Sequence, residues 1–164
     1  QRILSLGQSV DVALKGAGGL LPVGLLMMLA FAIGRLCGSE GLGTGTYVAS
    51  VVGVNVPHAV IAALLFAVSS LIAFSTGTSW GTFAIMLSIG VPLASSLQLD
   101  LPLIVAAVLG GGVFGDHCSP ISDTTVVSSM ASASDHIDHV RTQLPYALAA
   151  ATGTLILYLM AGLR

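Results

Sequence analysis

The sequence contains very little charge. Among its 164 residues only five are Lys or Arg and seven are Asp or Glu, and residues 41–99 contain none of the four. An average soluble domain carries about 25% charged residues, whereas this chain carries 7%. Such a composition excludes an ordinary soluble surface, so we expect a lipid bilayer to be the main solvent. The net charge of −2 also excludes the basic surface that binds nucleic acid.

The chain is also poor in cysteine, with only Cys37 and Cys118. Two widely spaced cysteines form neither a disulfide framework nor a CxxC metal motif. No signal-peptide pattern is present, and the chain starts at Gln1-Arg2 without an initiator methionine. We therefore expect residues 1–164 to be a single membrane domain, a piece of a longer membrane protein.

The sequence does contain long apolar runs, and 55% of its residues are hydrophobic. About 20 helical residues cross the hydrocarbon core of a bilayer. We predict an all-α, polytopic membrane protein, with residues 1–15 forming an interfacial helix or the tail of an upstream element and 38–55 a loop and short helix. The predicted membrane segments are 16–37, 57–74, 83–97, 101–115 and 144–163.

Two polar interruptions divide these runs, TGTSWGT at 76–82 and GDHCSPISDTT at 115–125. Unpaired backbone groups in hydrocarbon cost several kcal/mol each, so such segments occur only where protein or a wet cavity receives them. The pattern predicts discontinuous helices, either broken or re-entrant. In the second interruption, Ser119-Pro120 predicts a helix start, with a short helix at 126–134 and a solvated loop at 135–141. Paired interruptions of this kind indicate the substrate site of a secondary transporter.

The second interruption places Asp116 and Asp123 among several hydroxyls and freed carbonyls. These hard oxygen ligands suit Na⁺ better than soft metals. An acidic side chain in a membrane segment indicates function, because its burial is costly. Such a carboxylate becomes neutral either by binding a proton or by sitting beside a cation, and burial makes the proton competitive. Competition at one site, combined with alternating access, predicts a cation/proton exchanger.

An enzyme remains an alternative. Such an enzyme would use either a metal site at His117 and Cys118, with downstream His136, Asp138 and His139, or a nucleophile at Ser79 paired with a histidine. Zinc requires four ligands at about 2.0–2.3 Å, and the sequence lacks both HExxH and GxSxG. We expect no zinc site and no catalytic residues.

The segment GDHCSPISDTT, followed by DHIDHVRTQLPYAL and preceded by TGTSWGTF, closely resembles the C-terminal part of the NhaC-type Na⁺/H⁺ antiporter family, within the ion transporter superfamily. The resemblance implies a multi-pass inner-membrane antiporter that exchanges Na⁺ for H⁺ and needs no cofactor. It further implies an inverted-repeat fold whose N-terminal half is missing from this chain. Some relatives couple Na⁺ or H⁺ to organic anions or amino acids, and this alternative stays open, as does a homodimer.

The resemblance places the polar tips of the two interruptions at 76–79 and 119–124. Combined with the ligand chemistry, it makes Asp123 the predicted carrier shared by Na⁺ and H⁺, with Asp116 as a second carboxylate. The remaining predicted oxygen ligands or positioning groups are Ser119, Ser122, Thr124, Thr76, Thr78 and Ser79.

Overall fold

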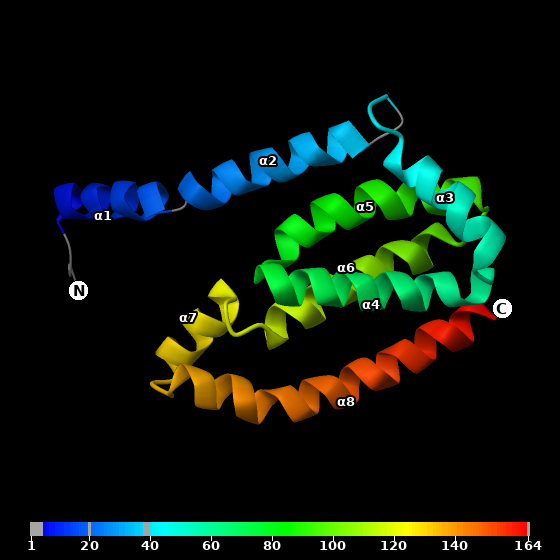
Figure 1. Cartoon of the computed structure of the whole chain (residues 1–164). Coiled ribbons are helices and arrows are strands. Elements are labelled where there is room, and N and C mark those ends of the chain that lie inside the picture. Colours follow the sequence, from blue (N-terminus) through cyan, green and yellow to red (C-terminus); the bar gives the residue numbers. More distant parts are fainter. Residues whose placement is uncertain (1–4, 20, 38–39, 164) are drawn as a thin grey trace.

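The computed structural model describes residues 5–19, 21–37 and 40–163, and within these ranges it contains helices and no strand. The predicted all-α class is therefore confirmed. The helices, shown in Figure 1, are α1 (Leu6–Gly19), α2 (Leu21–Cys37), α3 (Thr44–Asn55), α4 (His58–Thr76), α5 (Ser79–Ser96), α6 (Leu101–Cys118), α7 (Asp123–Ala131) and α8 (His136–Gly162).

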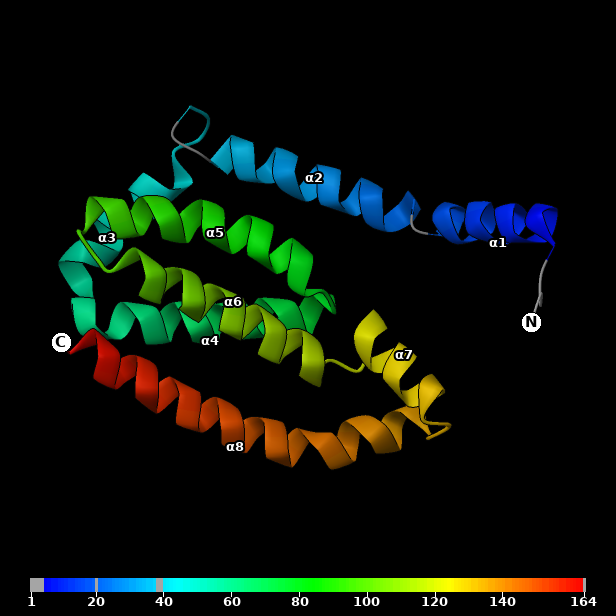
Figure 2. The ribbon, with the colours of Figure 1, turned by 180° about the vertical axis from the view of Figure 1, so that it is seen from behind.

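Four of the described helices, α4, α5, α6 and α8, are long and apolar enough to cross a membrane. The four helices run side by side (Figures 1 and 2). α5 is antiparallel to α4, α6 is antiparallel to α5, and α8 is antiparallel to α6. The chain is thus a multi-pass membrane protein. α7 has nine residues, too few to span a bilayer.

The core lies between α4, α5 and α6. Its buried apolar side chains include Ile61 and Phe66 of α4, Leu93 of α5, and Ile104 and Val108 of α6. α2 runs along the outer side of α5, and α1 projects away from the bundle (Figure 2). α8 lies against α4 and α6 on the other side, and none of its residues is fully buried.

Glycine allows α6 to approach α4 very closely. A Cβ added at Gly111 would collide with the carbonyl oxygen of Phe66, and one at Gly115 would collide with that of Ser70. Small residues at helix interfaces are a common way to bring membrane helices together. The close contact matters for function because it fixes the C-terminal turn of α6 against α4.

Three details of the sequence interpretation are wrong. The segment 135–141 is not a solvated loop, because α8 begins at His136 and the Asp135 carboxylate caps it by accepting hydrogen bonds from the backbone N–H groups of Ile137 (2.9 Å) and Asp138 (3.1 Å). Ser119-Pro120 does not start a helix: Ser119 directly follows the end of α6 at Cys118, and α7 begins only at Asp123.

The third concerns 16–37, whose residues 16–19 belong to α1 while α2 begins at Leu21. Other boundaries are shifted. The first interruption shrinks to Gly77 and Thr78, because α4 continues to Thr76 and α5 starts at Ser79. Parts of the expected segments, residues 1–4, 20 and 38–39, lie outside the described residues.

The α4–α6 contact yields a test. Gly115→Ala should lower thermal stability in detergent, because overpacking typically costs about 1–3 kcal/mol and the obstacle here is backbone. Gly153→Ala in α8 is the matched control, since a Cβ there meets nothing within 4 Å. Thermal unfolding followed by size-exclusion chromatography measures both. Equal melting temperatures for the two variants would contradict the tight contact.

Candidate cation site

The two polar interruptions lie against each other. Ser119 Oγ donates a hydrogen bond of 2.8 Å to the carbonyl oxygen of Phe74, in the last turn of α4. Gly77, with φ of +67°, forms the turn between α4 and α5, and a Cβ added there would lie 2.9 Å from the carbonyl oxygen of Ile121. The four-residue loop Ser119–Ser122 therefore packs directly on the turn of the α4–α5 hairpin.

Asp116 is the centre of the oxygen cluster at this junction. Its side chain is only 6% exposed. Ser122 Oγ donates to Oδ1 and Thr124 Oγ1 donates to Oδ2, both at 2.9 Å. The two hydroxyl oxygens are themselves 2.7 Å apart. Four oxygens from α6, the loop and α7 thus form a closed ring.

The ring is short of one hydrogen when Asp116 is ionised. It contains three close O···O contacts, whereas the hydroxyls of Ser122 and Thr124 supply two hydrogens. A proton on Asp116 would supply the third. All four oxygens also have lone pairs, and oxygen donors of this kind are the ones that hard cations prefer.

The local sequence explains how Ser122, six residues after Asp116, comes close enough to hydrogen-bond to its carboxylate. Backbone angles at Ser119 (φ −74°, ψ 129°) and Ser122 (φ −71°, ψ 136°) are extended, so the helix stops at Cys118 and restarts at Asp123. Ser119 Oγ accepts a 3.3 Å hydrogen bond from the N–H of Ile121, which tightens the loop. Pro120 supports the stop because it has no N–H for a helix to use.

Asp123 lies differently. It occupies the first turn of α7, its side chain is exposed, and it makes no hydrogen bond or ion pair to any other described residue. A carboxylate at a helix N-terminus is stabilised by the helix dipole. The structure therefore brings Asp116, Ser119, Ser122 and Thr124 together and leaves Asp123 on the outside of this chain.

The predicted residues of the first interruption contribute mainly backbone. Thr76 Oγ1 donates to the carbonyl oxygen of Ile72 at 2.8 Å. The carbonyl oxygen of Thr78 accepts a 2.9 Å bond from the buried Thr82 hydroxyl. Ser79 is the first residue of α5 and is half-buried. None of these three predicted side chains is hydrogen-bonded to Asp116 within the described part of the chain.

Sequence reasoning missed Ser69. Its side chain is fully buried on α4, and its hydroxyl has no hydrogen-bond partner among the described residues. A Cβ at Gly111 would lie 2.9 Å from the Ser69 Cβ, so the hydroxyl belongs to the α4–α6 interface. In the sequence, the signal that pointed to this residue was the pair Ser69-Ser70 inside an otherwise apolar helix.

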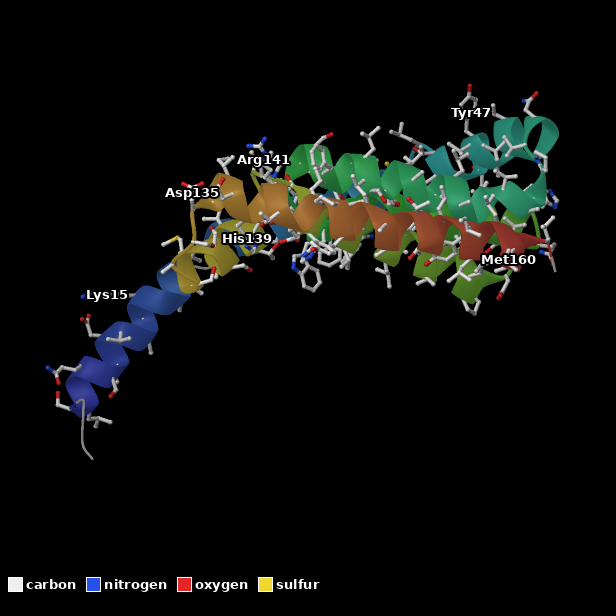
Figure 3. All side chains as sticks on the ribbon, turned by 90° about the horizontal axis from the view of Figure 1, so that it is seen from below. Lys15, Tyr47, Asp135, His139, Arg141 and Met160 are labelled. Atoms are coloured by element: carbon white, nitrogen blue, oxygen red, sulfur yellow. The ribbon has the colours of Figure 1, made fainter. Side chains whose placement is uncertain are left out.

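Charged residues gather at the same end of the bundle. Figure 3 places Asp135, His139 and Arg141 together where α8 begins, and Tyr47 at the opposite end. In the ranges that the structure describes, no group of three or more His, Cys, Asp and Glu side chains could hold a metal ion. This end of the bundle therefore combines exposed charged side chains with the buried carboxylate of Asp116.

The chain is similar to several known proteins. A 43% identical protein of Haemophilus influenzae, named only as uncharacterized, matches 92% of this chain and 28% of its own length. The malate-2H⁺/Na⁺-lactate antiporter of Bacillus subtilis is 38% identical over 58% of this chain and 20% of its own. The Na⁺/H⁺ antiporter NhaC of Alkalihalophilus pseudofirmus is 33% identical over 59% of this chain, and the match covers 22% of that antiporter's own length.

The chain thus spans between a fifth and a third of the length of these curated relatives. No solved structure matches it significantly. The sequence profile of the Na⁺/H⁺ antiporter family matches residues 2–163, nearly the entire chain. This chain, whose two helix interruptions pack against each other, belongs to the Na⁺/H⁺ antiporter family.

Proposed function

We propose that this chain carries the cation site of a transporter that exchanges Na⁺ for H⁺ across the cytoplasmic membrane, and that Asp116 binds the two ions alternately. The observation that carries the proposal is the ring of four oxygens around Asp116, which lacks one hydrogen when the carboxylate is ionised. Family membership supports the reaction. The remainder of the transporter would supply the opposite wall of the ion path.

Burial favours Asp116 over Asp123 as the shared carrier. Asp116 is only 6% exposed, and burial of a carboxylate favours its neutralisation by a proton or a cation. The carboxylate of Asp123 is exposed in this chain, so burial does not favour its neutralisation. We assign Asp123 to attracting cations at the entrance, where its charge and the other acidic residues of this end raise the local cation concentration.

Coupling to an organic anion or an amino acid is the second candidate function. Relatives named for malate and lactate favour the organic anion, and a relative named for arginine and ornithine favours the amino acid. The oxygen ring around Asp116 has no basic side chain among its members. A carboxylate substrate would need such a group, so the ring itself favours a simple cation as the bound species.

Asp116→Asn should abolish exchange, because an amide can neither bind a proton in this range nor neutralise Na⁺. The measurement is Na⁺-induced collapse of a preformed pH gradient in everted vesicles carrying the full-length protein. Asp123→Asn is the comparison and should weaken Na⁺ affinity while retaining exchange. Active Asp116→Asn together with inactive Asp123→Asn would return the carrier role to Asp123. A strict need for added malate or lactate would favour the second candidate function.

Thr124→Val should raise the Na⁺ concentration for half-maximal exchange, because it removes one of the four oxygens of the ring. The Thr124 hydroxyl lies 2.9 Å from Asp116 Oδ2 and 2.7 Å from Ser122 Oγ, and valine offers only a methyl group in its place. A hydrogen bond to a charged group contributes about 1.5–3 kcal/mol, which corresponds to an increase of about 10- to 150-fold. Exchange in everted vesicles over a range of Na⁺ concentrations measures it.

Ser128→Ala is the matched control for Thr124→Val. Ser128 is exposed on the same short helix, and its hydroxyl donates to the carbonyl oxygen of Thr124 and not to Asp116. Its half-maximal Na⁺ concentration should stay within about twofold of the unsubstituted protein, as for a surface substitution. An unchanged half-maximal Na⁺ concentration in Thr124→Val would contradict the role of the ring.

A further inference from the structure

The first turns of α8 hold the loop between α6 and α7. His136 Nε2 lies 2.6 Å from the carbonyl oxygen of Pro120, the second residue of that loop. His136 Nδ1 lies 3.1 Å from Ser129 Oγ on α7. Two turns further along α8, Gln143 Nε2 donates to the carbonyl oxygen of His117 at 2.8 Å. α8 therefore contacts the chain before the loop, within it and after it.

The chemistry of the Pro120 contact fixes the hydrogen on His136. A carbonyl oxygen only accepts, so Nε2 must carry the hydrogen in either protonation state. Nδ1 is then free to accept from the Ser129 hydroxyl or, when protonated, to donate to it while that hydroxyl donates to the carbonyl oxygen of Val126, 2.8 Å away. The bond to Pro120 is preserved in both states.

We propose that His136 and Gln143 are positioning residues that brace the cation site from α8. The inference rests on the proposed function of Asp116. The loop is held on one side by the bond from Ser119 to Phe74 of α4, and on the other by His136. Ser122, at the end of the same loop, completes the ring around Asp116. Releasing the brace should therefore loosen the ring without removing any of its members.

The way α8 is attached makes this brace important. At its far end Gly162 lies against the backbone of Ala59, at the start of α4. Between the two ends, Ala151, Leu155 and Tyr158 of α8 pack against the core, and the ring centroid of Tyr158 lies 5.4 Å from that of Phe66. An open apolar pocket of about 470 Å³ lies beside this contact; Phe66, Phe114, Leu148 and Leu155 are among the residues that line it. Through His136 and Gln143 the loop is thus tied to a helix that is anchored on the core.

The transport test compares three variants of the full-length protein in everted vesicles. His136→Leu should raise the Na⁺ concentration for half-maximal exchange about 3- to 10-fold, as expected for losing one neutral hydrogen bond, with a smaller change in maximal rate. His136→Gln keeps a donor near the place of Nε2 and should stay within about twofold of the parent. His139→Leu is the control, since its ring makes no hydrogen bond to another described residue.

A second measurement does not depend on transport. The thiol of Cys118, 3% exposed and next to Ser119, should react faster with a maleimide in His136→Leu and Gln143→Leu, in a background where the other cysteines, including Cys37, are replaced. Unchanged labelling in both variants would overturn the brace. Faster labelling with an unchanged half-maximal Na⁺ concentration would overturn its link to the cation site. Failure of Asp116 as the carrier would appear separately, as activity of Asp116→Asn with the labelling result intact.

Discussion

A helix that stops among apolar surroundings leaves carbonyl and N–H groups that need partners, and this requirement governs the arrangement of the site. α4 and α6 stop beside each other because Gly111 and Gly115 let their backbones meet. One hydroxyl, that of Ser119, then serves both ends, donating to Phe74 of α4 and accepting from Ile121 within the loop. The loop cannot move away from α4 without exposing that carbonyl, so the joined helix ends form a fixed platform on which the oxygen ring is built.

The oxygen ring follows from the same need for partners. An ionised Asp116 offers more lone pairs than the hydrogens of Ser122 and Thr124 can satisfy, and the two hydroxyl oxygens face each other at 2.7 Å. Either a proton or a cation would relieve that deficit. Exchange requires a site for which the two occupied states are close in free energy, because strong preference for one ion would exclude the other at ordinary concentrations. A half-satisfied ring of neutral hydroxyls around one carboxylate meets that condition better than a cage of several carboxylates would.

The sequence predicted the apolar helices and located both interruptions, because long uncharged runs leave few other structures for a chain in a bilayer. It did not predict where the helices restart. Ser119-Pro120 suits both the end of one helix and the start of the next, and only the contact with Phe74 decides between them. The charged run 135–141 suggested a loop, although Asp135 caps the helix that contains it. Which of two acidic residues is buried depends on the direction of the loop, and the spacing of Asp116 and Asp123 carries no information about that direction.

The last helix links this local chemistry to larger movement. α8 is 27 residues long, has no fully buried residue, and faces a cavity along its middle. Its apolar contacts with the core come from partly buried side chains, among them Ala151, Leu155 and Tyr158, whereas α4 and α6 meet through backbone at Gly111 and Gly115. Its polar first turns nevertheless hold both sides of the loop next to Asp116. Alternating access requires the affinity of a site to change when a part of the protein moves. The structure thus combines a close α4–α6 contact beside a buried carboxylate with a last helix that is hydrogen-bonded before, within and after the loop next to that carboxylate.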